Sequence, residues 1–161
     1  MDLLTLTRRR LVRLGLDAPA KERAIEVLLD FLVSETAVPK DARDSILQAI
    51  FTRERRLSTG LEHGVAIPHG ITNAIEEEVA AVGIFPQGVP FDAADGLPAR
   101  IVILLITPEL KRYRHVANLA SIARQMRKPE LRELLCRART LEDAVAALAL
   151  PAGDNEGDVR T

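Results

Sequence analysis

His69 is the residue of this sequence best suited to nucleophilic chemistry. It stands between Pro68 and Gly70, directly after the short apolar run 65–67. Pro68 fixes its own φ, and Gly70 has no side chain to crowd the imidazole, so the ring is expected to sit on rigid backbone. A neutral imidazole can attack a phosphoryl donor near neutral pH, because its ordinary pKa is about 6.5. His69 is therefore the predicted phosphoryl acceptor.

A phosphorylated imidazole carries a dianionic group that needs cationic and hydrogen-bonding partners. Close to His69 in sequence, Arg53 can supply the cation, and a polar turn can supply hydroxyl and amide donors to bind phosphate: Ser58, Thr59 and Gly60. His115 is far away in sequence but can reach the same site from a predicted helix. The chain has no Walker loop and no nucleotide fingerprint, so the phosphoryl group is expected to arrive from another protein.

From the residues alone, these roles have alternatives. His115 shares one apolar stripe of its helix with neighbouring residues, so half-buried packing explains it as well as a role in the site does: Leu119, Ile122 and Met126. Arg53 can act simply as a positive charge at a helix C-terminus. His63 lies in a polar turn, where it is interpreted as a solvated residue.

Two other chemistries fit less well. The three histidines could in principle hold zinc, but they show no HExxH spacing, and no cysteine or acidic cluster completes a ligand set. A serine hydrolase would need a GxSxG sequence, which surrounds neither Ser58 nor Ser121. We therefore expect no metal and no dissociable cofactor.

The elements that position these residues follow two periods. Apolar residues recur at helical spacing in five segments: 20–34, 40–55, 112–127, 129–138 and the stretch after Thr140, which forms a capping signal with Asp143. Short runs rich in β-branched residues predict strands at 65–67, 79–85 and 101–107. Because helices flank the strands, we expect a single three-layer α/β/α domain over residues 1–150. The polar residues 151–161 are expected to form a disordered tail.

Composition argues against several classes of function. The chain has 161 residues, of which 47% are hydrophobic, enough for one domain with a core. The 22 basic and 23 acidic residues nearly cancel, so net charge points to neither nucleic acid nor membrane. The single cysteine, Cys136, rules out an intramolecular disulfide, and no apolar run approaches the ~20 residues of a transmembrane helix. We expect a cytoplasmic protein without direct membrane insertion or nucleic-acid partners.

Three short sequences precede or include the predicted acceptor in a recognisable order: Arg53-Glu54, Ser58-Thr59-Gly60 and Gly64-Val65-Ala66-Ile67-Pro68-His69. Together they resemble the signature of enzyme IIA domains of the phosphotransferase system (PTS), fructose/mannitol type, a superfamily that includes the nitrogen-regulatory IIA proteins. Residues 88–108, GVPFDAADGLPARIVILLITP, resemble the second strand block of that family. The resemblance covers roughly residues 1–150.

This resemblance implies a phosphotransferase that carries a phosphoryl group for sugar transport. His69 would accept the group from the histidine phosphocarrier HPr and pass it to a cysteine of a IIB partner. His115 and Arg53 would stabilise the phosphate or the transition state. The family fold is a mixed β-sheet flanked by helices on both sides. Two departures from the family pattern are His63, at a turn position where Asn, Gly or Arg is common, and Val116, where leucine is usual.

The resemblance leaves a second function open. Because no fused IIB or IIC segment is present, the chain is expected either to serve a separate sugar permease or to act as a regulatory module of the nitrogen-regulatory type. Such a module would bind regulatory protein targets in a phosphorylation-dependent way, without sugar transport. A scaffold that no longer accepts phosphate is disfavoured by the intact histidines.

Overall fold

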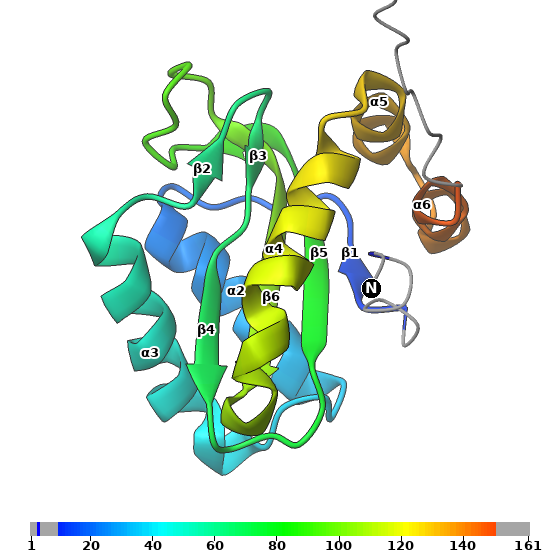
Figure 1. Cartoon of the computed structure of the whole chain (residues 1–161). Helices are drawn as coiled ribbons and strands as arrows, with labels where there is room; N and C mark the ends of the chain where they lie inside the picture. The colour runs from blue at the N-terminus through cyan, green and yellow to red at the C-terminus, as the bar shows by residue number, and fades with distance from the viewer. Residues whose placement is uncertain (1–2, 4–9, 151–161) are drawn as a thin grey trace, which may run out of the picture.

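The structure is a computed structural model that describes residue 3 and residues 10–150 (Figure 1). Its α-helices are α2 (Lys21–Ser34), α3 (Arg43–Arg56), α4 (Arg112–Met126), α5 (Pro129–Arg137) and α6 (Leu141–Leu148). Short 3-10 helices precede two of them, η1 (Lys40–Ala42) before α3 and η2 (Glu109–Lys111) before α4. The strands are β1 (Val12–Arg13), β2 (Gly60–Leu61), β3 (Val65–Ala66), β4 (His69–Thr72), β5 (Val79–Val89) and β6 (Ala99–Pro108).

The described strands form one mixed, open sheet of six strands. The long strands β5 and β6 pair antiparallel at its centre, and β1 runs parallel to β5 on one side. On the other side, β3 and β4 both run parallel to β6, while β2 pairs antiparallel with β3. The register aligns Val65 with Ile101 and His69 with Leu105, so β3 and β4 are two parts of one interrupted strand.

Pro68 stands next to this interruption. Proline has no N–H to donate to a sheet ladder. Its carbonyl still accepts a hydrogen bond from the backbone N–H of Leu105, with an N–O distance of 3.0 Å. The chain is therefore held to β6 immediately before His69, which begins β4.

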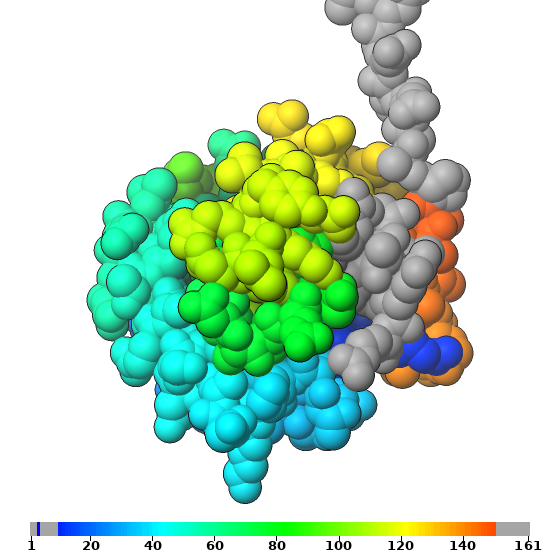
Figure 2. All heavy atoms as spheres, turned by 60° about the horizontal axis from the view of Figure 1, so that its bottom comes forward, coloured from blue at the N-terminus to red at the C-terminus, as the bar shows by residue number. Residues whose placement is uncertain are grey.

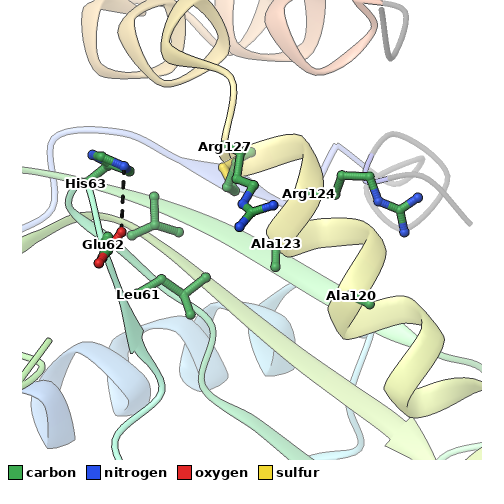
Figure 3. Close-up of a pocket in the computed structure, with 9 residues that line it drawn as sticks. Leu61, Glu62, His63, Ala120, Ala123, Arg124 and Arg127 are labelled. Carbon is green, nitrogen blue, oxygen red and sulfur yellow. Dashed lines mark ion pairs between the residues drawn. The ribbon is translucent and has the colours of Figure 1, made fainter. Parts of the chain in front are cut away.

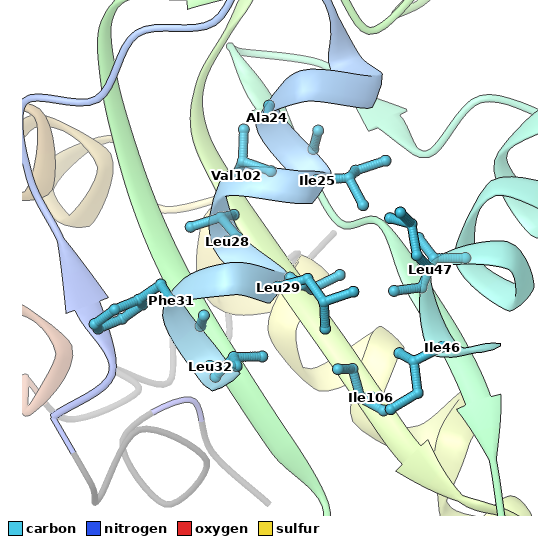
Figure 4. Packing of buried hydrophobic residues seen from close by; sticks show 14 of the residues in the cluster. Ala24, Ile25, Leu28, Leu29, Phe31, Leu32, Ile46, Leu47, Val102 and Ile106 are labelled. Carbon is cyan, nitrogen blue, oxygen red and sulfur yellow. The ribbon is translucent and has the colours of Figure 1, made fainter. Parts of the chain in front are cut away.

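Helices cover both faces of the sheet. Since successive strand residues point to opposite faces, the buried strand β6 supplies both cores. On one face, Val102 and Ile106 pack under α2 and α3 with aliphatic side chains that include Leu28, Leu29, Ile46 and Leu47 (Figure 4). On the other face, α4, α5 and α6 pack on a second core that includes Val65, Ile103, Leu105, Ile122 and Leu135. This arrangement confirms the predicted α/β/α architecture and the mixed sheet.

The predicted helices are confirmed to within three residues at their ends, and three of the six strands were not predicted. The strands β1 and β2 have two residues each, too few to show a period. His69 follows β3, as predicted, but it is also the first residue of β4, a strand that was not predicted because it is defined by pairing with β6 rather than by local alternation.

The capping signal before α6 is confirmed. The hydroxyl of Thr140 accepts a hydrogen bond from the backbone N–H of Asp143 at 3.1 Å, and the Asp143 carboxylate accepts one from the backbone N–H of Thr140 at 3.0 Å. Within the described residues, no helix is both long and apolar enough to cross a membrane. The predicted tail, residues 151–161, lies outside the described residues.

Candidate functional site

His69 is held at the start of β4 with one ring nitrogen engaged. Its side chain is only 8% exposed. The Nδ1 atom lies 2.8 Å from the backbone carbonyl oxygen of Ile67. A carbonyl oxygen can only accept a hydrogen bond, so Nδ1 carries the proton of the neutral ring. The lone pair is then on Nε2, which makes Nε2 the nucleophilic nitrogen.

The glycine after His69 has a packing role. A Cβ atom added at Gly70 would lie 2.9 Å from Cγ1 of Ile50 and 3.4 Å from its backbone nitrogen. The space that Gly70 leaves open is therefore occupied by α3, which approaches β4 closely at this position. This close approach brings the C-terminal half of α3 alongside His69. Glycine at position 70 is therefore explained by the packing of α3 rather than by a need for free space around the imidazole.

His115, on the first turns of α4, lies next to His69. The centroids of the two imidazole rings are 5.1 Å apart, and the rings are tilted by 58°. His115 is 8% exposed, and its Nδ1 atom lies 2.8 Å from the hydroxyl oxygen of Thr107, near the end of β6. The structure thus brings together two histidines that are 46 positions apart in the sequence (115 − 69).

A cleft of about 610 Å³ opens between α3 and α4 over the start of β4. Its walls include both histidines and the side chain of Arg53 from α3. One guanidinium nitrogen of Arg53 donates a hydrogen bond to the carbonyl oxygen of Leu57 at 2.7 Å, which fixes the side chain at the helix end. A guanidinium has five N–H groups, so further donors of Arg53 remain for a ligand. Arg56 also lines this cleft.

Ser58, Thr59 and Gly60 do not line this cleft. The hydroxyl of Ser58 donates to the carbonyl of Phe91 and accepts from the backbone N–H of Gly60. The backbone N–H and hydroxyl of Thr59 donate to the carboxylate of Glu54, at 3.1 and 2.5 Å. Their donors are thus used to anchor the connection from α3 to β2.

Burial shifts the titration of both histidines in the same direction. The pKa of His69 is lowered, mainly because burial disfavours the charged ring and further because of the nearby Arg53 charge. The pKa of His115 is lowered to about 4 by burial first, and then by the charges of His69, Arg112 and Arg53. Both rings are therefore neutral at neutral pH, and a neutral His69 keeps its nucleophilic lone pair.

Two buried polar residues near the histidines were not among the predicted site residues. Thr107 has no exposed surface and orients His115 through its hydroxyl. Its signal in the sequence is a polar residue in the otherwise aliphatic run 101–106. Asn118 is 3% exposed, lies three residues after His115 on α4, and its side-chain nitrogen has no hydrogen-bond partner among the described residues. The sequence has no comparable signal for Asn118, because polar residues are common in an amphipathic helix.

The structure does not bring the three histidines together. His63 lies in the turn between β2 and β3 and lines a different cleft. Among the described residues, no group of three or more histidine, cysteine or acidic side chains has a geometry that could hold a metal ion.

Comparison with known proteins adds to this geometry. A family model described as phosphoenolpyruvate-dependent sugar phosphotransferase system, EIIA 2, matches residues 5–150. The PTS fructose-specific EIIA component of Haloferax volcanii is 33% identical over 148 residues, covering 90% of this chain and 95% of that protein. The crystal structure of the nitrogen regulatory protein IIA-Ntr from Neisseria meningitidis matches with a TM-score of 0.77 and 29% identity, covering 86% of this chain and 93% of that one.

A third match concerns the fold alone. It is a chain in the solved complex of enzyme IIA mannitol with phosphorylated enzyme IIB mannitol from Escherichia coli. The match has a TM-score of 0.71 and 23% identity, and it covers 87% of this chain and 94% of that one.

Proposed function

The chain belongs to the EIIA 2 family of the phosphoenolpyruvate-dependent sugar phosphotransferase system, and on that premise we propose that His69 carries a phosphoryl group between two proteins. The donor is a phosphorylated HPr-type carrier, and the acceptor is a cysteine of a IIB domain. The observation that carries this proposal is the geometry of the two histidines. His69 is buried, its Nδ1 is bonded to the Ile67 carbonyl, and a second imidazole lies 5.1 Å away at the same cleft.

The accepting step uses both nitrogens of His69. The lone pair on Nε2 attacks the phosphorus atom, a new N–P bond forms, and the N–P bond to the donor histidine breaks with its electron pair leaving on the donor ring. Because Nδ1 keeps its proton, the ring of His69 gains positive charge. The carbonyl oxygen of Ile67, 2.8 Å from Nδ1, stabilises that charge. Transfer to the cysteine thiolate reverses these changes.

Arg53 and His115 then stabilise the phosphoryl oxygens. Arg53 lines the cleft, and its remaining N–H groups are charged donors that can bind the phosphoryl oxygens. When the Thr107 hydroxyl donates to Nδ1 of His115, Nε2 of His115 carries the ring proton and can donate one hydrogen bond. The low pKa of His115, about 4, keeps that ring neutral. A neutral donor stabilises the phosphoryl group by a hydrogen bond. A positively charged ring would bind the group more tightly and slow its transfer to the acceptor.

We assign Ser58, Thr59 and Gly60 a supporting role, because their donors bind Glu54, Phe91 and one another. Glu54 is itself 5% exposed and lies 3.4 Å from the ammonium nitrogen of Lys21. This network ties the end of α3 to the hairpin that leads into β3. It therefore positions Arg53 and the strand before His69.

The surface around the cleft suits a transient protein partner. Val116, which lines the cleft, is 75% exposed, and three apolar side chains close in sequence to lining residues are also exposed: Leu57 at 71%, Leu110 at 90% and Tyr113 at 75%. In the space-filling view, atoms of the N-terminal half of α4, coloured yellow-green, lie at the centre of the face toward the viewer (Figure 2). Exposed apolar groups beside arginines are typical of protein contact sites. The IIB assignment is supported by the mannitol IIA–IIB complex, whose IIA fold this chain shares. We place this exchange in the cytoplasm, where carriers of this system meet.

A regulatory function is the second candidate, favoured by the match to IIA-Ntr from Neisseria meningitidis. In that case His69 would still accept the phosphoryl group. Its phosphorylation would control binding to regulatory targets rather than sugar uptake.

The test is phosphorylation of the full chain by phosphoenolpyruvate, enzyme I and HPr, followed by intact mass. We expect the gain of one acid-labile phosphoryl group in the parent and its loss in His69→Ala. The matched control is His63→Ala, which removes a histidine from the other cleft and should be labelled like the parent. Labelling of His69→Ala at the parental rate would overturn the site assignment. No labelling of the parent, with HPr active on another IIA protein, would contradict the carrier proposal.

A further inference from the structure

A second cleft, of about 520 Å³, lies between the β2–β3 turn and the C-terminal half of α4 (Figure 3). It has none of the lining residues of the His69 cleft. Its apolar surface comes from both walls: Leu61, Val65, Ala120, Ala123 and Met126. The small side chains of the two alanines leave the space open along α4. Volumes of this size are typical of small-molecule sites, which are mostly apolar with a few polar groups.

The turn that forms one wall is held in a costly conformation. His63 has a φ of 66°, in the left-handed region that non-glycine residues rarely adopt. Its backbone N–H donates to a carboxylate oxygen of Asp95 at 2.7 Å, and the other oxygen of Asp95 accepts from the backbone N–H of Leu97 at 3.1 Å. Backbone strain of this kind is characteristic of functional sites. The His63 wall is thus fixed in place by a second loop.

Opposite charges face each other across this cleft. Figure 3 shows the guanidinium of Arg127 beside α4 on one side of the cleft, and the carboxylate of Glu62 on the turn at the other side. Within the described residues, Arg127 forms no ion pair, and the only ion pair of Glu62 is with the ring of His63, at 4.0 Å between its carboxylate oxygen and Nε2. Arg124 also lines the cleft, but its guanidinium points away from the turn.

We propose that this cleft binds a small zwitterion with an apolar side chain, of the α-amino acid class. The ligand carboxylate pairs with the guanidinium of Arg127, which has the planar donor geometry that carboxylates match. The ligand ammonium group pairs with the carboxylate of Glu62. The hydrocarbon side chain packs on the accessible apolar surface of Leu61, Ala120 and Ala123, over the buried Val65 and Met126. A simple anion would leave Glu62 opposed to it, and a simple cation would leave Arg127 opposed to it.

The test uses L-leucine as the probe, with two analogues of similar hydrocarbon shape. The compound 4-methylpentanoate lacks the ammonium group, and 3-methylbutylamine lacks the carboxylate. Binding to the full chain is followed by the NMR signal of the Met126 methyl group, labelled with ¹³C, because Met126 lines the cleft. We expect a saturable shift with leucine, with a dissociation constant near 1 mM, and at least about tenfold weaker binding of both analogues.

Variants then test which charged group of the ligand each protein side chain binds. Arg127→Gln should weaken leucine at least about tenfold but leave 3-methylbutylamine unchanged or bound more tightly. Glu62→Gln should weaken leucine and leave 4-methylpentanoate unchanged or bound more tightly. The control is Arg137→Gln, which removes the same charge from an exposed position of α5 and should change nothing. These variants keep the folded core intact, because Glu62 and Arg127 are exposed.

Three outcomes would overturn the proposal. One is the absence of a saturable shift with leucine up to about 10 mM. Another is binding of 4-methylpentanoate as tight as leucine, which would make the site an anion site. The last is an unchanged leucine affinity in Arg127→Gln. None of these readouts depends on phosphorylation of His69.

Discussion

The two clefts along α4 use histidine in opposite ways. In the cleft beside the N-terminal half of α4, His69 and His115 are each 8% exposed and each has Nδ1 engaged by an oxygen atom. In the cleft beside the C-terminal half, His63 is exposed, with 58% of its side chain accessible, and only its backbone is fixed, by Asp95. In the first cleft the imidazole rings themselves are held in place, whereas in the second cleft only the backbone of the histidine is. Burial and ring contacts, rather than the presence of histidine, therefore distinguish the proposed phosphoryl site from the second cleft.

The largest expected effect is that of removing His115, which should differ from that of removing His69. His115→Ala should still accept a phosphoryl group on His69 but should transfer it about 100-fold more slowly, since it removes one donor to the phosphoryl oxygens. Rapid-quench measurement of both half-reactions with HPr and a IIB acceptor checks this. Equal rates for His115→Ala and the parent would make His115 a packing residue only, and complete loss of labelling would make it indispensable for acceptance.

The pH dependence of stability is the second test. Burial lowers the pKa of His115 from 6.5 to about 4 and also lowers that of His69. Unfolding therefore takes up protons below pH 6.5, so stability present at higher pH is lost as the pH falls. For His115 the loss approaches about 3 kcal/mol by pH 4. Urea unfolding at several pH values should show a shallower loss for His115→Gln than for the parent. Parallel curves would mean that the ring is not buried as described.

Gly70→Ala should weaken the wall of the buried cleft. The added Cβ would meet Ile50 at 2.9 Å, so α3 must move away from β4. We expect a loss of about 1–3 kcal/mol in the free energy of unfolding, as for other overpacked cores, together with slower labelling of His69. Thermal unfolding and labelling rates measure the two effects. An unchanged melting temperature would show that α3 does not rest on this glycine.

The smallest effect concerns the exposed cleft and has the opposite sign. His63→Gly should leave stability unchanged or raise it by about 0.5 kcal/mol, because glycine adopts a φ of 66° without steric cost but loses more backbone entropy on folding. His63→Ala is the matched variant, since it keeps the Cβ atom and should not gain. A clear loss of stability in His63→Gly, measured by urea unfolding, would mean that the imidazole itself supports the turn.

The sequence predicted the helices and the central strands well because their apolar periods are long. Thr140 and Asp143 even placed the start of α6, since a capping box is a local interaction. By contrast, β4 and the contact between His115 and His69 depend on pairing with β6 and on the packing of α4, which connect distant segments. Nothing in the polar turn at 58–60 reveals that its donors are used by Glu54 and Phe91. Interactions between residues close in sequence could be predicted, but which distant group takes a given hydrogen-bond donor could not.

The hydrogen bond from Nδ1 of His69 to Ile67 has a kinetic consequence. Because that nitrogen is turned inward, the proposed donor and acceptor proteins would both have to approach the ring from the Nε2 side. Each protein would cover Nε2, which the other protein also needs. The donor and the acceptor would therefore bind one after the other, and a ternary complex would not form. The expected rate law is ping-pong, in which excess donor binds the phosphorylated carrier and there competes with the acceptor.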